Sequence, residues 1–224
     1  MARRRVDGLL IDSGIAGRGN LIAELVRLHI PAVIFDHDLP PDAPHLGVIQ
    51  SDHASGMRAA VAHLAEQGHE RIALICGPNS WWPAHERRRA FLAGLAAAGI
   101  APEPSLVRSI DMSAAMAYAE ASAFLTAARP PTALIAGGNV LLLGVLRALQ
   151  AHSWVAGRDL ALVGADDLDI TQLHSPPITV IARDLDMLGE LAVHLLLETI
   201  QGGGGRGMTL PTQLVVRASS HLWV

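Results

Sequence analysis

Three polar side chains of complementary type follow apolar segments of the chain. Arg87 lies near the start of a helical segment that comes after an apolar run, and Asn139 and Asp166 follow apolar runs at residues 132–136 and 160–163. Because α/β proteins bind ligands at the carboxyl ends of their strands, these side chains are expected to face one crevice. An arginine donor, a carboxylate acceptor and an amide that does both suit a polyhydroxylated ligand. The chain is therefore predicted to bind a small molecule.

The basic cluster at residues 86–89, ERRR, has other interpretations. It is compatible with a solvated helix turn, an anion site or a nucleic-acid patch. Its position after a strand and a loop lets at least one arginine face the crevice. The planar fork of arginine donates two parallel hydrogen bonds, which fit vicinal hydroxyls or a carboxylate. Arg87 is accordingly the first candidate ligand contact.

The sequence does not match the known motifs for catalysis, cofactor binding or metal binding. The glycine turn at residues 14–19 has the spacing G-x-x-G-x-G, whereas a dinucleotide site needs G-x-G-x-x-G. A nucleophile elbow and a phosphate loop are also absent. The eleven histidines, including His63 and His69, show no zinc-site spacing, and the acidic stretch at residues 166–169 is too short for a calcium loop. We expect no enzyme, no cofactor and no metal, and interpret the histidines as scattered over the surface.

Composition favours a soluble cytoplasmic protein. The 224 residues are 50% hydrophobic with a formal net charge of −4, which argues against a dedicated nucleic-acid surface. The single cysteine, Cys76, excludes an intrachain disulfide, fits a reducing compartment and is expected to be buried in its apolar run. The apolar segment after the basic start is broken by Asp7 and closed by Asp12, unlike a signal peptide. The nearly apolar run at residues 133–146 is shorter than the roughly 20 residues that span a bilayer.

Strand-like and helix-like segments alternate along almost the whole chain. Apolar runs at residues 6–11, 31–35 and 71–76 are each followed by a segment with helical periodicity. Strands separated by helices of ten or more residues pair in parallel through right-handed crossovers. An α/β architecture with parallel sheets covered by helices on both faces is therefore predicted.

The segment at residues 184–201 carries two apolar stripes. Leucines at 185, 188, 191 and 195 form the first stripe, while Met187, Val193, Leu196 and Ile200 supply the second. A helix that is apolar over most of its circumference is buried on more than one side. We expect it to pack either on its own sheet and on a second subunit, or within a single subunit.

Several short motifs in a fixed order give a resemblance to a known family. They comprise VDGLLI at residues 6–11, IPAVIFD at 30–36, GHERIA at 68–73, PTALIA at 131–136, LVGADD at 162–167, PPITV at 176–180 and LPTQLVVRAS at 210–219. Together they resemble the effector-binding domain of LacI-type transcriptional regulators over residues 6–220. The resemblance implies a periplasmic-binding-protein-like type I fold, in which two interwoven subdomains bind a small metabolite, usually a sugar or nucleoside.

The same resemblance implies the subdomain boundaries. The N-terminal effector subdomain is expected at residues 1–51 plus 182–211, and the C-terminal one at residues 52–181 plus 212–224. The family has a helix-turn-helix, a hinge helix and further strand–helix units before the equivalent of Val6. We therefore expect no DNA-binding domain in this chain and an incomplete N-terminal sheet, as in a fragment, a misassigned start or a degenerate gene.

The resemblance also bears on individual site residues. Arg87 matches the arginine of an R-x-x-G-F motif and Asp166 the first aspartate of G-[YF]-D-D, both effector contacts in the family. Asn139 stands where the family usually has an aspartate, and loss of that carboxylate is expected to change the hydroxyl pattern that is recognised. Ser13 and Asp36 are expected on the opposing wall.

The expected partners follow from this assignment. They are a small sugar- or nucleoside-like effector, a second copy of the chain bound through residues 184–201, operator DNA only through a missing helix-turn-helix, and no membrane. A stand-alone solute-binding protein and a nucleotide-using enzyme are the alternative functions.

Overall fold

The computed structural model describes residues 6–12, 21–40, 42–203 and 205–221. The chain forms two compact units. Unit 1 comprises Met1–Asp52, Ser80–Pro83 and Asp184–Leu210, and unit 2 comprises His53–Asn79, Ala84–Arg183 and Pro211–Val224. Each unit is built from segments that are far apart in sequence.

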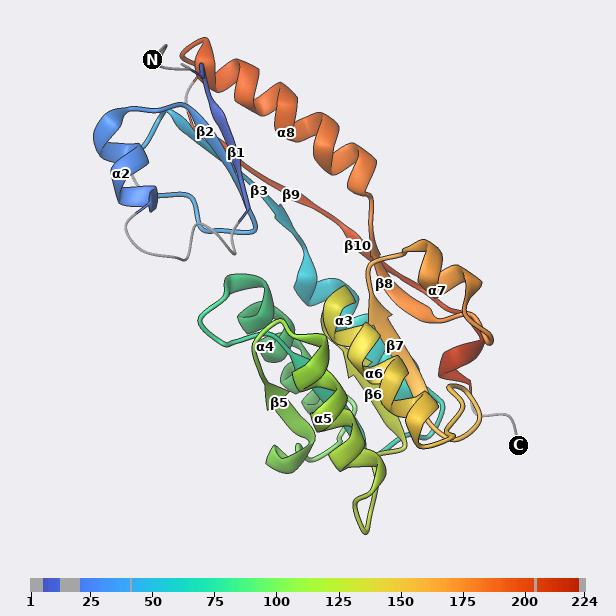
Figure 1. Ribbon diagram of the computed structural model, residues 1–224. Helices are drawn as coiled ribbons and strands as arrows, with labels where there is room; N and C mark the ends of the chain where they lie inside the picture. Colours follow the sequence, from blue (N-terminus) through green and yellow to red (C-terminus); the bar gives the residue numbers. More distant parts are fainter. Residues whose placement is uncertain (1–5, 13–20, 41, 204, 222–224) are drawn as a thin grey trace. The chain divides into compact units, whose positions relative to one another are not determined.

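Unit 1 is a parallel sheet with one described helix on each face (Figure 1). The strand order is β1-β2-β3-β9, with β1 (Leu9–Ile11), β2 (Ala32–Phe35), β3 (Leu46–Ser51) and β9 (Gly207–Leu210). The helices are α2 (Leu21–Leu28) and α8 (Leu185–Ile200). Within the described part of the chain, β1 pairs with β2 on one side and has no strand on its other side.

Side chains of β2 alternate between the two faces of this sheet, as a strand requires. Ala32 and Ile34 pack in one cluster with Leu25 of α2. Val33 packs in the opposite cluster with Ala192 and Leu195 of α8. The apolar run that sequence analysis interpreted as a strand is therefore buried on both faces.

Helix α8 is less enclosed than its two apolar stripes predicted. Its buried residues are Ala192, Leu195 and Thr199, on the side that contacts β1, β2 and β3. Five apolar side chains remain 37–50% exposed: Leu185, Met187, Val193, Leu197 and Ile200. Leu188, Leu191 and Leu195 of the first stripe pack on the sheet of unit 1, as does Leu196 of the second, whereas Leu185 and the rest of the second stripe are exposed in the single chain.

Unit 2 contains a six-stranded sheet of order β10-β8-β7-β6-β4-β5. Its strands are β4 (Ile72–Cys76), β5 (Val107–Ser109), β6 (Ala133–Ala136), β7 (Ala161–Ala165), β8 (Thr179–Arg183) and β10 (Thr212–Val215). Only β10 runs antiparallel to its neighbour among these strands. The helices are α3 (His53–Glu66), α4 (Trp82–Ala97), α5 (Ala114–Leu125), α6 (Asn139–Ala151) and α7 (Asp169–Leu173).

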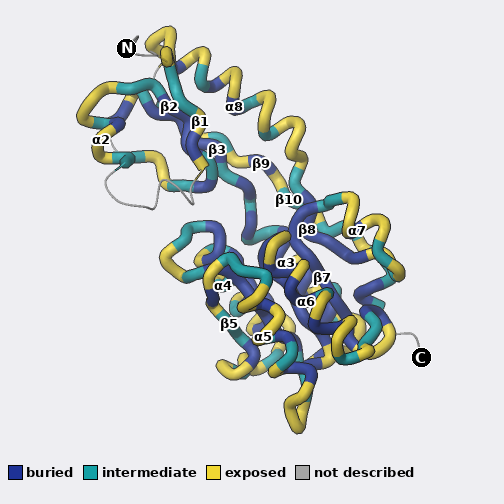
Figure 2. The backbone as a smooth tube through the Cα atoms, in the orientation of Figure 1, coloured by how far each residue is buried: buried dark blue, intermediate teal, exposed yellow. Residues whose placement is uncertain are grey.

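The sheet of unit 2 is buried on both faces, and the helices expose only their outer sides (Figure 2). Ala133 and Ile135 of β6 pack with Phe91 of α4, whereas Leu134 packs on the other face with Val145 of α6. The predicted α/β fold with parallel sheets between helices is confirmed.

The expectation for Cys76 is confirmed, whereas that for the histidines is wrong in part. Cys76 is fully buried, and this burial raises the pKa of its thiol. His53 and His69 are each only 3% exposed, and His69 Nδ1 lies 2.9 Å from Thr132 Oγ1. Periodicity did not reveal these positions because a polar side chain can be buried once it finds a hydrogen-bond partner.

Two properties of the described residues bear on membranes and metals. None of their helices is long and apolar enough to cross a membrane. Among the same residues, no group of three or more His, Cys, Asp or Glu side chains is arranged to hold a metal ion.

Candidate functional site

The candidate site lies at the carboxyl edge of the sheet in unit 2. Strands β4, β6, β7 and β8 are consecutive neighbours and all parallel, so their carboxyl ends share one edge. The segments that follow these ends supply Gly137, Asn139 and Asp166, and β8 itself ends at Arg183. This edge is where open α/β sheets place their ligands.

Arg87 lies in the second turn of α4 and is only 7% exposed. Its Nη1 donates a hydrogen bond to the backbone oxygen of Gly137 at 2.9 Å. The bond connects α4 to the loop after β6, and it orients the guanidinium at the edge. Arginine is costly to bury without hydrogen-bond partners, and this bond offsets part of that cost.

Asn139 is the first residue of α6 and is exposed. Its Oδ1 accepts a hydrogen bond from the backbone N–H of Val140 at 2.7 Å. The amide Nδ2 supplies two further donors at this point of the edge. A Cβ on the preceding Gly138 would lie 2.7 Å from Met112 Cε, the mobile end of a flexible side chain.

Asp166 follows β7 and is held in a left-handed backbone conformation, with φ of 64°. Its side chain is 8% exposed, and its Oδ1 accepts a hydrogen bond from Arg183 Nε at 2.7 Å. Arg183 was not among the site residues predicted from the sequence. A charged residue at the end of a strand, at the same edge as Asp166, was the signal that could have found it.

Asp167, the second aspartate of the pair, has a structural role. Its Oδ2 receives a hydrogen bond from Arg217 Nη2 at 2.7 Å, and its Oδ1 receives one from Thr171 at 3.1 Å. The Arg217 guanidinium holds the pKa of the Asp167 carboxyl below its usual value. Asp167 thereby anchors α7 and the C-terminal segment, which leaves Asp166 as the aspartate at the sheet edge.

The other two predicted site residues, Asp36 and Ser13, belong to unit 1. Asp36 follows β2, is 7% exposed and accepts a hydrogen bond on Oδ1 from the backbone N–H of Ser51 at 2.7 Å. It therefore lies at the carboxyl end of its own sheet, as its position after a strand predicted. Ser13 lies outside the described residues.

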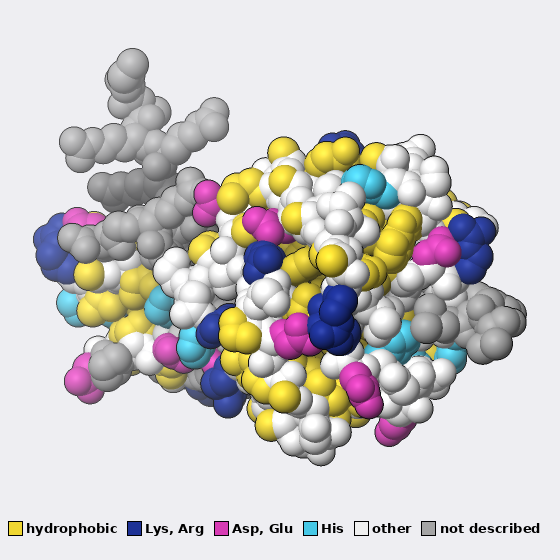
Figure 3. Space-filling view, turned by 90° about the horizontal axis from the view of Figure 1, so that it is seen from below, with side chains coloured by type: hydrophobic (Ala, Val, Ile, Leu, Met, Phe, Trp, Pro, Cys, Tyr) yellow, Lys and Arg dark blue, Asp and Glu magenta, His cyan; other side chains and the backbone are white. Residues whose placement is uncertain are grey.

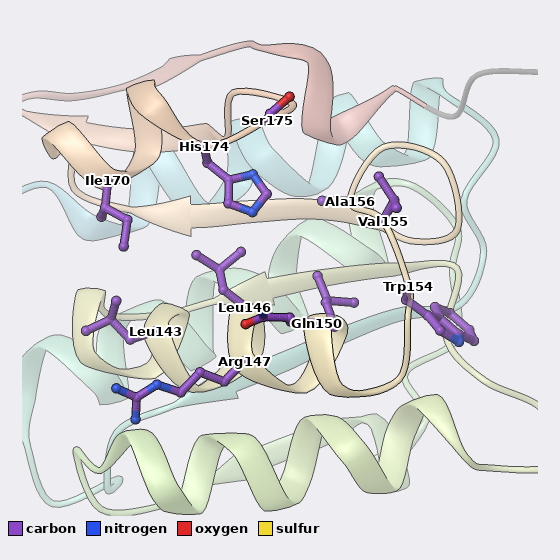
Figure 4. Close-up of a pocket in the computed structure, with 11 residues that line it drawn as sticks. Leu143, Leu146, Arg147, Gln150, Trp154, Val155, Ala156, Ile170, His174 and Ser175 are labelled. Atoms are coloured by element: carbon purple, nitrogen blue, oxygen red, sulfur yellow. The ribbon is translucent and has the colours of Figure 1, made fainter.

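A cavity of about 540 Å³ lies elsewhere in unit 2, beside α6 and α7 (Figure 4). Leu143 and Leu146 of α6 lie on one side of it, and Ile170 and His174 lie on the other. Arg87, Asn139 and Asp166 do not line it. Apolar side chains form much of the lining of this cavity, which distinguishes it from the polar sheet edge.

This architecture, with parallel α/β sheets and polar residues at their carboxyl edges, is that of a ligand-binding domain. A family model described as a periplasmic binding protein-like domain matches residues 61–220, and the chain belongs to this family. Within this class, its relatives are LacI-type transcriptional regulators, as the resemblance implied.

Three relatives show the extent of the similarity. The lactose operon repressor of Escherichia coli K12 is 30% identical over 218 residues, which cover 97% of this chain and 59% of the repressor. This chain also matches a structure of the lac repressor dimer bound to operator and the anti-inducer ONPF with a TM-score of 0.78. That match covers 64% of the repressor chain. The HTH-type transcriptional repressor CytR of E. coli K12 is 27% identical over 97% of this chain and 64% of its own length. The complex of the regulator CelR with cellobiose has a TM-score of 0.87 at 28% identity, over 96% of this chain and 66% of that one.

The chain thus spans about three fifths of the length of the curated repressors named here, 59% and 64%. These relatives share the fold and are repressors of transcription.

Proposed function

We propose that this chain is the ligand-sensing domain of a LacI-type transcriptional regulator. It binds a small effector and thereby controls the affinity of a DNA-binding module for its operator. The observation that carries the proposal is the gathering of Arg87, Asn139 and Asp166 at the carboxyl edge of one buried sheet. Arg87 and Asp166 are buried and Asn139 is exposed, and hydrogen-bonding groups at such an edge give a ligand orientation and specificity.

In this proposal the two compact units are the two effector subdomains. Arg87, Asn139 and Asp166 contribute the contacts of the C-terminal subdomain, and Ser13 and Asp36 those of the N-terminal subdomain. Arg87 donates to the effector, Asp166 orients it, and Asn139 adds its amide. A sugar or a nucleoside is the ligand class, supported by the cellobiose complex of CelR.

The proposed partners follow from the same relatives. Operator DNA is contacted through a helix-turn-helix module, and the protein works in the cytoplasm as a homodimer, with no catalytic step. The lac repressor dimer on its operator supports this assembly. Basic and acidic side chains are interspersed on the face drawn in Figure 3, unlike a surface that binds the phosphate backbone of DNA. We place the dimer contact on the exposed stripe of α8.

Calorimetry of the whole chain against sugars, nucleosides and nucleotides tests the proposal. Arg87→Ala is expected to weaken effector binding by about 30- to 1,000-fold, because a desolvated bidentate contact is lost. Arg129→Ala, at an exposed arginine outside the candidate site, is the matched control and is expected to bind like the parent. Tight nucleotide binding that survives Arg87→Ala would overturn the sensor function in favour of a nucleotide site.

A further inference from the structure

Two histidines lie side by side at the amino edge of the sheet in unit 1. His29 follows α2, and His45 immediately precedes β3. The centroids of their rings are 5.0 Å apart, and the ring planes are inclined by 31°. Asp36 of the candidate effector site lies at the opposite, carboxyl end of β2. No metal-site spacing relates the two histidines in the sequence, so the fold alone brings them together.

The backbone fixes the proton on each ring. His29 Nδ1 lies 3.3 Å from the Arg27 oxygen, and His45 Nε2 lies 3.2 Å from the Leu25 oxygen. A carbonyl oxygen can only accept a hydrogen bond, so these two nitrogens carry the protons of the neutral rings. The other nitrogens, His29 Nε2 and His45 Nδ1, are therefore unprotonated, and each has a lone pair.

One of these lone pairs is buried without a partner. His45 Nδ1 is shielded from solvent and has no hydrogen-bond partner among the described residues. Buried polar atoms nearly always have a partner, and an exception is a place where an ion or a water can bind. The ring of His29 is exposed, so a small ion can reach the pair from solvent.

The separation of the rings fits coordination of one metal ion by both histidines. Imidazole nitrogens bind zinc at about 2.0–2.1 Å, which puts the metal about 3.2 Å from each ring centroid. With a tetrahedral angle at the metal, the centroids are then about 5.2 Å apart, close to the 5.0 Å between these rings. Metal-binding histidines also commonly donate their other ring N–H to a backbone carbonyl, as both rings do here.

The end of α2 adds a potential that favours a cation. The carbonyls of Leu25 and Arg27 belong to the last turn of this helix, and a helix C-terminus carries a partial negative charge. The positive charge of Arg27 is paired with Glu24. Imidazole suits Zn²⁺, Ni²⁺ and Cu²⁺, whereas Mg²⁺ and Ca²⁺ prefer oxygen ligands. The two rings therefore select a transition metal.

We propose that His29 and His45 bind a divalent transition-metal ion such as Zn²⁺, Ni²⁺ or Cu²⁺. His29 Nε2 and His45 Nδ1 are the two protein ligands, and water completes the coordination. Two ligands agree with the finding that no group of three or more metal-binding side chains is present among the described residues. The metal links the turn after α2 to the start of β3 and stabilises unit 1, at the sheet edge opposite Asp36.

Helix capping is the alternative role of these rings. If His29 and His45 only donate to the last carbonyls of α2, glutamine can replace them because its amide is also a donor, and added metal has no specific effect. If the rings bind metal, the glutamine variants fold like the parent but lose the stabilisation by metal. The metal-dependent part of the stability therefore separates the two roles.

Calorimetry and thermal unfolding of the full chain with Ni²⁺, Zn²⁺ and Cu²⁺ test the proposal. We expect an unfolding temperature that rises with metal concentration, because the ion binds the folded chain, and we expect Cu²⁺ to bind most tightly. Mg²⁺ is the matched comparison and is expected to cause no shift. A shift of the same size with Mg²⁺, or no binding of the three transition metals, would overturn the proposal.

Variants of the two histidines locate the metal. His29→Gln and His45→Gln are each expected to weaken the affinity for Ni²⁺ by at least about tenfold, since one of two protein ligands is lost. His194→Gln is the control, because this exposed histidine lies four residues after Glu190 on α8 and is not part of the pair. An unchanged affinity in both site variants, or an equal loss in His194→Gln, would assign the metal to other residues and refute the pair.

Paramagnetic broadening gives a readout that does not require a folded His45 variant. Substoichiometric Cu²⁺ is expected to broaden the ring signals of His29 and His45 in NMR spectra before those of the other histidines. His29→Gln, at an exposed position, identifies the His29 signal and is expected to abolish the early broadening at His45. Early broadening at other histidines, or broadening at His45 that persists in His29→Gln, contradicts the two-histidine site.

Discussion

Arg87 donates a hydrogen bond from Nη1 to the backbone oxygen of Gly137 at 2.9 Å, across 50 residues of sequence. This bond places a buried cation from α4 beside the loop that begins α6. The geometry depends on the fork of the guanidinium, which can bond the loop and a ligand together.

Arg87→Lys is therefore expected to weaken effector binding at least about tenfold although the charge is kept. A lysine ammonium is a point charge that cannot reproduce the planar, bidentate geometry. Calorimetry with the best ligand of the panel measures the loss. Arg129→Lys is the control, and an affinity within about twofold of the parent for Arg87→Lys would remove Arg87 from the site.

The contact between α5 and α6 depends on a helical glycine. A Cβ at Gly144 would lie 2.3 Å from the Ala114 oxygen and 2.6 Å from Ala117 Cβ. We expect Gly144→Ala to lower the free energy of unfolding by about 1–3 kcal/mol, because overpacking forces backbone shifts. Gly189→Ala in α8, where a Cβ meets nothing within 4 Å, is expected to raise it by about 0.5–1 kcal/mol. Urea unfolding measures both, and equal changes would contradict the packing argument.

Stability is expected to fall in mild acid because of two histidines in unit 2. Burial lowers the pKa of His63, assisted by the nearby His221, and burial also lowers the pKa of His69. The unfolded chain then binds more protons than the folded chain below about pH 6.5, so the stabilisation is present above that pH and is lost as pH falls through the folded pKa values.

Urea unfolding between pH 8 and about pH 5 measures this dependence. His63→Gln is expected to flatten the profile, because a glutamine does not titrate in this pH range. Its amide can still pair with Ser220 Oγ, which lies 2.8 Å from His63 Nε2, so the folded structure is kept. His194→Gln, at an exposed position of α8, is the control and is expected to leave the slope unchanged. A slope that persists in His63→Gln and in His69→Gln would assign the acid sensitivity to other groups.

Self-association is expected to depend on the exposed stripe of α8. Met187 and Val193 are 48% and 49% exposed, and a charge there would be buried at a dimer contact. Met187→Asp with Val193→Asp is therefore expected to shift sedimentation to the monomer. Leu173→Asp, at an 83% exposed leucine of α7, is the comparison. Dissociation by Leu173→Asp alone would move the dimer contact to the α6 and α7 side, and a monomeric parent chain would refute the dimer.

The sequence by itself determined the elements and the edge that carries the candidate site. Apolar runs followed by helical periodicity predicted strands such as β4 and β6, and the burial of Cys76 followed from its apolar run. The positions of Asn139 and Asp166 after their strands predicted a common sheet edge. These features follow from local periodicity and from the geometry of parallel strands.

Only the tertiary structure decided the partners of the polar side chains. Asp166 meets Arg183 because β7 and β8 are neighbours in the sheet, and Asp167 meets Arg217, 50 residues away. The burial of His69 and the exposure of Met187 also depend on what packs against each element. Periodicity assigns a residue to a face of its own element, whereas strand order and long-range packing decide which side chain or solvent that face meets.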